Sequence, residues 1–91
     1  MAHQIRLKEK AEADLAAMPL WLQSSVESYL TRLAVSSSSI SRPAVSPPHP
    51  PGGMVAETDC GPVDGRSYHI TVFFLYSQDE TSLIITRIGY Y

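Results

Sequence analysis

The chain has little positive charge, a single cysteine and no long apolar run, and each shortage excludes a class of protein. Its 91 residues carry 7 Lys and Arg against 9 Asp and Glu, a net charge of -2. It therefore lacks a general basic field that would capture phosphate backbones. One cysteine, Cys60, permits neither an internal disulfide nor a zinc site built from several cysteines. We expect Cys60 to be a bystander thiol in a turn, and we expect the protein to occupy a reducing compartment.

Long hydrophobic stretches are also missing. Residues 1–7 are charged and lack the apolar core of a secretory signal, and no window approaches the roughly 18 apolar residues of a membrane span. We therefore expect a cytoplasmic protein that has no membrane partner. The short length predicts one domain, residues 1–91, whose core comes from few elements.

The chain is rich in β-branched and aromatic residues over its last quarter, residues 66–91. Two such runs, residues 67–76 and 82–90, flank the polar segment 77–81, a pattern typical of an antiparallel hairpin. Every second residue of the first run is apolar and lies on the face that we expect to be buried: Tyr68, Ile70, Val72, Phe74 and Tyr76.

The sequence before this hairpin predicts a short strand and two amphipathic helices. Residues 3–7 alternate like an edge strand, and from Lys8 onward the apolar period becomes that of a helix. Pro19 fits the first turn of a second helix, because its missing N–H is not needed there. The second helix has an apolar stripe at helical spacing: Leu22, Val26, Tyr29, Leu30 and Leu33. We interpret this stripe as core.

Residues 35–53 differ from the rest, with four consecutive serines and a cluster of prolines. Proline removes backbone donors and biases its predecessor toward extended geometry, so we expect a flexible Ser/Pro-rich loop here. Residues 54–58 then predict a strand, and residues 59–65, rich in Asp, Gly and Pro, predict a turn. The predicted order is β-α-α-β-β-β, an α+β fold in which the N-terminal strand and the helical hairpin pack on an antiparallel sheet.

The pairing of the last two strands decides which side chains share a face, because a slip of one residue turns every side chain over. A two-residue turn at Asp79 and Glu80 would set Arg87 opposite Val72 and bury its charge, which is costly without a partner. We therefore predict the register that sets Ile88 opposite Val72. This register puts four residues over the helices: Ile84, Thr86, Ile88 and Tyr90. It puts four others together on the opposite face: His69, Phe73, Arg87 and Tyr91.

The residues best suited to chemistry are His69, Arg87, Tyr90 and Tyr91, with Arg66 at the entrance of the first long strand. Arginine can hold a phosphate with two hydrogen bonds, tyrosine can stack on a base or donate a proton, and histidine titrates near neutrality. Together they could cleave RNA without a metal or cofactor, by activating a 2′-hydroxyl and stabilising the charged transition state. The alternative is a solvent-facing sheet surface on which a cation lies over aromatic rings.

Four short motifs follow one another in a familiar order: Ala-Glu-Ala-Asp-Leu at 11–15, an aromatic strand at 73–76, an acidic turn at 79–80 and Arg-Ile-Gly-Tyr-Tyr at 87–91. In this order they resemble the RelE/ParE superfamily of bacterial toxins from type II toxin-antitoxin modules. The resemblance implies a cognate antitoxin, and a target that is ribosome-bound mRNA in the ribonuclease members or gyrase in the ParE branch. We expect Arg87, Tyr91 and His69 to be the catalytic residues of such an endoribonuclease. We expect Arg66, Tyr90 and Phe73 to contact its substrate.

The chain departs from the ribonuclease members where they carry cations. Val72 or Phe73 stands near the position of a family arginine, Tyr90 replaces a closing basic residue, and residues 54–58 contain Glu57 but no cation. Three hypotheses therefore stay open. The chain is a toxin that cleaves mRNA or inhibits another essential target, a catalytically inactive interaction module of the same fold, or an unrelated small α+β protein that binds a peptide or small ligand.

Overall fold

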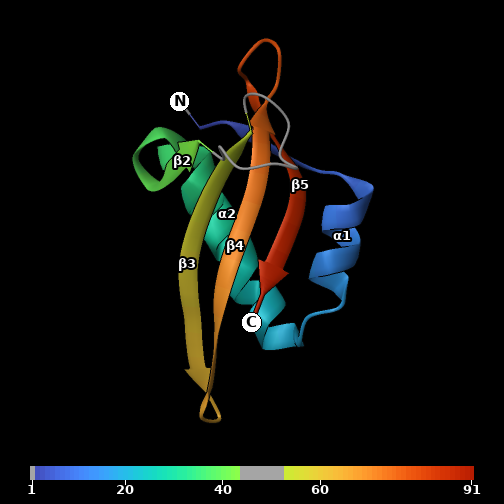
Figure 1. The fold of residues 1–91 in the computed structure, drawn as a ribbon, viewed down its shortest axis with the longest axis vertical. Helices are drawn as coiled ribbons and strands as arrows, with labels where there is room; N and C mark the ends of the chain where they lie inside the picture. The colour runs from blue at the N-terminus through green and yellow to red at the C-terminus, as the bar shows by residue number, and fades with distance from the viewer. Residues whose placement is uncertain (1, 44–52) are drawn as a thin grey trace.

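Two helices pack on a five-stranded sheet in the computed structural model of this chain, which describes residues 2–43 and 53–91 (Figure 1). The elements are β1 (Gln4–Leu7), α1 (Glu9–Ala16), α2 (Leu20–Ile40), β2 (Ser41–Pro43), β3 (Met54–Val63), β4 (Arg66–Tyr76) and β5 (Ser82–Tyr90). Their order in the sheet is β1-β5-β4-β3-β2. The predicted α+β fold is confirmed, and β2 is an addition to it. Because β1 runs parallel to β5 while the other pairs are antiparallel, the sheet is mixed.

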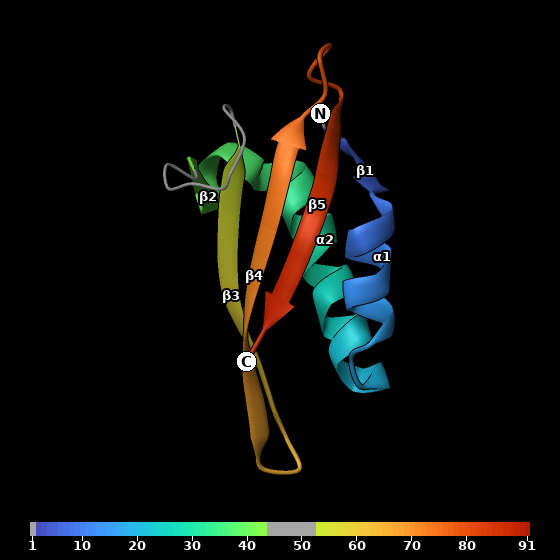
Figure 2. The same cartoon turned by 45° about the vertical axis from the view of Figure 1, so that its right-hand side comes forward.

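The core lies between α2 and one face of the sheet, and α1 lies beside β5 (Figure 2). The predicted stripe of α2 is buried along its whole length, and Leu22, Val26 and Leu33 have no exposed surface. Alternate residues of β4 are buried opposite it, with Ile70 and Val72 fully shielded from solvent. The predicted inward faces of both elements are therefore confirmed. No helix within residues 2–43 and 53–91 is long and apolar enough to cross a membrane.

The predicted loop over residues 35–53 is wrong for its first part, because α2 continues to Ile40 and β2 follows it. Serine lowers helix propensity only modestly, whereas proline breaks a helix, and the first proline after the start of α2 is Pro43. That proline holds Arg42 in extended geometry, which suits the edge strand. Residues 44–52 of the predicted loop lie outside the described residues.

The serine run is part of the packed structure. The backbone at Ser36 leaves helical geometry, with φ -129° and ψ 34°, and marks a kink in α2. The next residue, Ser37, is buried and accepts a hydrogen bond of 3.0 Å from the hydroxyl of Tyr76. Its carbonyl also accepts a hydrogen bond from the hydroxyl of Ser41. Side-chain contacts thus hold the end of α2 against β4.

The turn predicted over residues 59–65 is also wrong for most of its length. β3 runs to Val63, and only Asp64 and Gly65 connect it to β4. Both have positive φ, 51° and 75°, as a tight two-residue hairpin turn with the twist of its strands requires. Cys60 therefore lies in a strand, where it is buried, and burial raises the pKa of its thiol.

A β-bulge in β5 divides the last hairpin into two registers. Val72 lies opposite Ile88 as predicted, but Phe74 lies opposite Ile85 instead of Thr86. Thr86 is the extra residue of the bulge, and its hydroxyl donates a hydrogen bond of 3.1 Å to the carbonyl of Phe73. The backbone acceptor next to the bulge is thus satisfied by a side chain.

The bulge overturns half of the predicted inward face of β5. Leu83 and Ile85 are fully buried, whereas the predicted Ile84 and Thr86 are only half-buried. Beyond the bulge, Ile88 is buried as predicted. The predicted register holds after Thr86, and the alternative register, with a two-residue turn at Asp79 and Glu80, holds before it. Arg87 stays out of the core.

Candidate functional site

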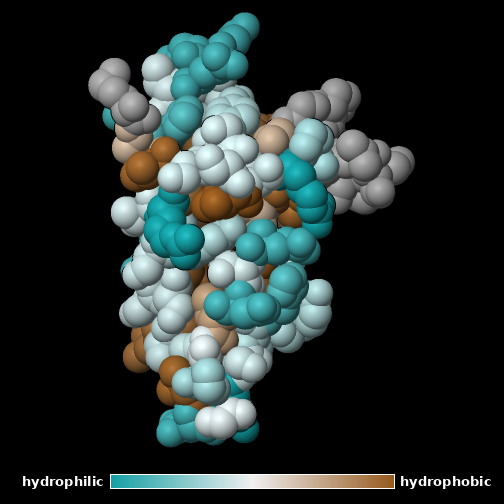
Figure 3. All heavy atoms as spheres, turned by 90° about the vertical axis from the view of Figure 1, so that its left-hand side faces the viewer, coloured by the Kyte–Doolittle hydropathy of each residue, from teal (hydrophilic) through white to brown (hydrophobic). Residues whose placement is uncertain are grey.

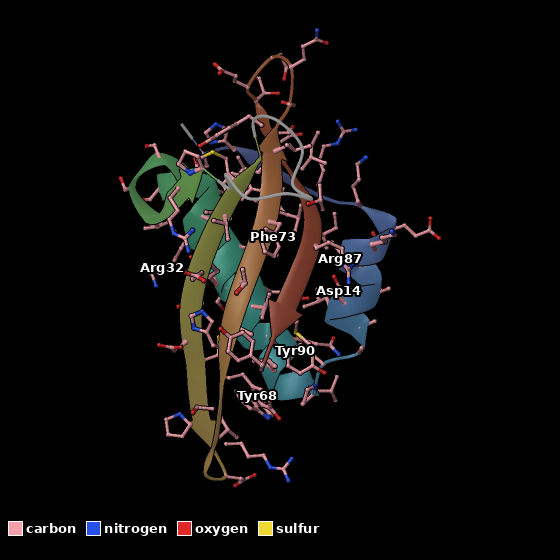
Figure 4. All side chains as sticks on the ribbon, viewed as in Figure 1. Asp14, Arg32, Tyr68, Phe73, Arg87 and Tyr90 are labelled. Atoms are coloured by element: carbon pink, nitrogen blue, oxygen red, sulfur yellow. The ribbon has the colours of Figure 1, made fainter. Side chains whose placement is uncertain are left out.

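The face of the sheet away from α2, called the open face from here on, brings together four of the predicted site residues. His69 exchanges backbone hydrogen bonds of 2.7 and 3.1 Å with Tyr91, and their rings lie 5.3 Å apart. Phe73 lies opposite Arg87 in the same ladder, and both are visible on this face in Figure 4. The pairing of β4 with β5 places these four residues on one face, as predicted.

Arg87 is bound by a carboxylate from α1. Its Nε donates to Asp14 Oδ2 at 2.8 Å and a terminal nitrogen donates to Oδ1 at 3.2 Å. The backbone N–H of Ile88 also donates to Asp14, at 2.9 Å. The hydrogen bonds from Arg87 first and from the Ile88 N–H second lower the pKa of Asp14, and the contact with Asp14 raises the pKa of Arg87. The Arg87 side chain is 57% exposed, but its charge is balanced by Asp14.

His69 lies between two carboxylates of β3. Its Nδ1 is 2.9 Å from Asp59 Oδ1 and its Nε2 is 3.4 Å from Glu57 Oε1. Hydrogen bonds to Asp59 first and to Glu57 second raise the pKa of His69. Since a carboxylate only accepts hydrogen bonds, this arrangement favours the imidazolium, in which both ring nitrogens donate. A histidine held in this form has no free lone pair with which to act as a general base.

Glu57 extends this cluster toward the edge of the sheet. It accepts a hydrogen bond of 2.8 Å from Arg42 of β2, and His69 together with Arg42 lowers the pKa of its carboxyl. The three cations Arg42, His69 and Arg87 are therefore each matched by at least one carboxylate. A phosphate backbone gains little from cations that are already paired. The surface is better suited to hydrogen bonds, ion pairs and stacking with another protein.

Tyr90 and Arg66 do not join the open face. Tyr90 lies on the side of the helices, where its ring is 5.5 Å from that of Tyr68 and its hydroxyl donates to the carbonyl of Ala17 at 3.4 Å (Figure 4). Arg66 begins β4 and lines a hollow of about 410 Å³ together with Trp21 and Tyr68. The predicted substrate-binding residues are thus divided between two regions of the molecule.

Four residues of this site were missed by the sequence prediction: Asp14, Arg42, Glu57 and Asp59. The signal for the two β3 carboxylates was the Asp-Gly pair at 64–65, which is a strong hairpin signal and would have set residue 59 near His69. No group of three or more His, Cys, Asp or Glu side chains in the described ranges, 2–43 and 53–91, is arranged to hold a metal ion.

Two helices packed on a mixed five-stranded sheet define a small α+β protein, and this fold is shared with solved toxin structures. The chain is similar to a chain of the toxin-antitoxin complex RelBE2 from Mycobacterium tuberculosis, with a TM-score of 0.77, 15% identity and 100% of both chains covered. It is also similar to a mutant of the E. coli toxin RelE in the free state. There the TM-score is 0.64 and the identity 11%, over 98% of this chain and 83% of that chain.

These likenesses confirm the RelE/ParE-like fold that the motifs predicted. No protein-family model and no curated protein sequence matches the chain. At 15% and 11% identity, the similarity resides in the arrangement of the elements and not in the residues that occupy them. The chemistry must therefore be argued from this chain's own side chains.

Proposed function

We propose that this chain is the toxin component of a type II toxin-antitoxin module, held inactive in the cytoplasm by a cognate antitoxin. The observation that carries the proposal is the full-length match of the fold to a chain of a toxin-antitoxin complex, with a TM-score of 0.77 over 100% of both chains. Contact between the first motif, at residues 11–15, and the last motif, at residues 87–91, adds support for the toxin proposal. Asp14 and Arg87 form a direct ion pair there.

The geometry favours a toxin that inhibits an essential protein by binding to it, in the manner of the gyrase inhibitors of the ParE branch. Asp59 and Glu57 favour the cationic form of His69, which is poorly arranged to remove a proton from a 2′-hydroxyl. Arg87 is engaged by Asp14, which reduces its capacity to hold a phosphate with two hydrogen bonds. The remaining open face offers ion pairs and an exposed Tyr91 ring.

Cleavage of mRNA on the ribosome is the second candidate, because one specific observation favours it. His69, Phe73, Arg87 and Tyr91 share one face. Tyr91 is 78% exposed, so its ring could stack on a base next to His69. In that reaction a cationic His69 would act as the acid that protonates the leaving oxygen. Tyr90 contacts Tyr68 and Ala17 on the side of the helices, and Arg66 lines the hollow beside Trp21, so neither residue joins the group on the open face.

Induction of the chain alone in a bacterium tests the toxin proposal. We expect growth arrest, and none with an equally expressed Val72→Asp variant, since that change places a charge in the core. Mapping of mRNA ends in the arrested cells then separates the two modes. Binding to a protein predicts no new ends and arrest that survives His69→Gln. Cleavage predicts new ends that His69→Gln, Tyr91→Ala and Arg87→Ala abolish and the exposed control Lys10→Ala retains.

Unimpeded growth with well-expressed, folded chain would contradict the toxin proposal. That outcome would instead favour the catalytically inactive interaction module or the unrelated binding protein. Growth arrest that disappears on co-expression of a small protein from an adjacent reading frame would identify the antitoxin.

A further inference from the structure

The two edges of the sheet are treated differently. At the β5 edge, β1 pairs as far as Ile85, whose carbonyl accepts a hydrogen bond of 2.9 Å from the N–H of Lys8. Just beyond, Asp14 accepts the N–H of Ile88. At the other edge, β2 pairs with residues 54–56 of β3, and residues 57–63 of β3 extend past that pairing. The regular β3 edge continues past β2 only from Glu57 to Cys60, because a register shift follows Cys60 and Pro62 has no N–H to donate.

The ladder fixes which backbone groups of β3 point outward. The N–H and C=O of His69 in β4 both form hydrogen bonds with Tyr91. The backbone N–H and C=O groups of odd residues in β4 therefore point toward β5, and those of even residues point toward β3. Thr58 lies opposite the even residue Ile70, so the backbone N–H and C=O of Thr58 point toward β4. Its neighbours Glu57 and Asp59 direct their N–H and C=O groups away from the sheet.

One of these outward groups already has a partner. The carbonyl of Glu57 accepts a hydrogen bond of 3.2 Å from the hydroxyl of Tyr29 in α2, as expected for a group at the edge. The N–H and C=O of Asp59 have no partner within the described ranges, 2–43 and 53–91. Unpaired backbone groups on an exposed strand form a template for an added strand.

The charges beside this edge differ on its two sides. The carboxylates of Glu57 and Asp59 stand on the open-face side, where the side chain of Asp59 is 84% exposed. On the other side Arg32 of α2 lies next to Tyr29 and beside β3 (Figure 4). Hydrophilic side chains gather over the middle of the molecule when it is seen from this edge (Figure 3). Because side chains of a strand alternate between faces, an added strand would meet acid on one face and base on the other.

We propose that residues 57–60 of β3 bind an extended segment of a protein partner as an additional strand, with Lys or Arg on the face that meets Glu57 and Asp59. The alternate side chains of that segment would face Arg32, where apolar or acidic residues fit and cations do not. Charge excludes a second copy of this chain, since two-fold antiparallel pairing centred on the free segment would set Asp59 against itself or Glu57. The inference goes beyond the proposed toxin function, because binding at this edge requires neither growth arrest nor catalysis.

A synthetic seven-residue peptide that alternates lysine with valine is the probe. Titrated into 15N-labelled protein, it should shift the amide signals of Glu57 and Asp59 and slow their hydrogen exchange, since strand addition protects outward amides. The same peptide N-methylated at alternate residues keeps every charge but cannot form a ladder, and it should not bind. Equal binding of the methylated peptide, or protection confined to other parts of the protein, would overturn the proposal.

Charge reversal supplies the second arm of this test. A Glu57→Lys and Asp59→Lys double variant should weaken binding of the lysine peptide by about tenfold or more, since two attractive charge pairs become repulsive. Asp64→Lys makes the same kind of charge change in the hairpin turn, away from the free edge, and should leave the affinity unchanged. An equal loss in both proteins would show that only overall charge attracts the peptide. Concentration-dependent dimerisation that protects the same amides would also overturn the proposal, since the occupant would then be a second copy.

Discussion

His69 is the residue whose environment most constrains function. Its ring nitrogens contact Asp59 and Glu57 of β3, and its ring lies 5.3 Å from that of Tyr91 at a tilt of 50°. Two carboxylates of one neighbouring strand therefore favour its protonated form. In an enzyme of this shape a histidine would be expected to exchange protons near neutrality. Here the two carboxylates stabilise the charged form, and the residue acts first as the centre of an ion-pair cluster.

A titration of His69 followed by NMR checks this environment. We expect a pKa above the ordinary value of about 6.5 in the folded protein. Asp59→Asn should lower that pKa the most, because the hydrogen bond to Asp59 is the largest cause of the shift, and Glu57→Gln should lower it less. Asp79→Asn, in the distant β4–β5 turn, serves as the control and should leave it unchanged.

The same shift gives stability a dependence on pH. The pKa of His69 is higher in the folded than in the unfolded chain, so its contribution is complete below about pH 6.5 and is lost as the pH rises through the folded value. The difference in Tm between the protein and a His69→Gln variant should therefore shrink with rising pH. A difference that grows instead would show that His69 folds in the neutral form.

At the scale of elements, Asp14 joins α1 to β5. Asp14→Ala should lower the free energy of unfolding by about 1–3 kcal/mol, because it removes a charged partner from Arg87 and leaves the N–H of Ile88 unmatched. Arg87→Ala should cost less, because Asp14 still accepts that N–H. Glu12→Ala, on the exposed side of the same helix, should change stability by no more than about 0.5 kcal/mol. Denaturant unfolding of the three variants measures the order, and equal costs for Asp14→Ala and Glu12→Ala would contradict it.

Hydrophobic periodicity predicted the elements well where a single face is buried. The stripe of α2 and the alternation of β4 were correct because burial against a core repeats with the period of the element. The end of α2 was missed because its serines carry no apolar period and become ordered through Ser37, whose partner Tyr76 is distant in sequence. The bulge at Thr86 was missed because alternation along β5 is compatible with two registers, each correct for one half.

The site was predicted only in part, for a related reason. Strand register sufficed to group His69 with Tyr91 and Phe73 with Arg87. The carboxylates that control two of these residues come from elements distant in sequence. Asp59 was assigned to a turn, which concealed its place opposite His69, and Asp14 was noted only as part of the motif at residues 11–15, without a partner. The balance of charge at the site therefore required the tertiary arrangement.

At the scale of the whole molecule, stability depends on one small core shared by α2 and the sheet. Leu33 is fully buried in it, so Leu33→Ala should cost about 2–5 kcal/mol by leaving a cavity. This is a large fraction of the roughly 5–15 kcal/mol that stabilises a typical domain. Val35, two residues further along α2, is 66% exposed, and Val35→Ala should change stability by no more than about 0.5 kcal/mol.

Denaturant midpoints of the two variants check the extent of this core. A similar loss at both positions would mean that the outer side of α2 is also packed. A small loss at Leu33 would place the end of the core before the last turns of the helix. Either result would contradict the burial that orients α2 on the sheet.

The bulge at Thr86 also affects how this sequence can be aligned with those of proteins that share its fold. Before Thr86 the odd residues of β5 face inward, and after it the even residues do. If β5 is aligned without a gap to a strand that has no bulge, the alternation of inward and outward residues matches in only one half of β5. In the other half, buried residues are aligned with exposed ones. A one-residue gap at Thr86 brings Leu83, Ile85 and Ile88 into a single alternating series. A sequence comparison that relies on β5 therefore needs a gap inside this strand.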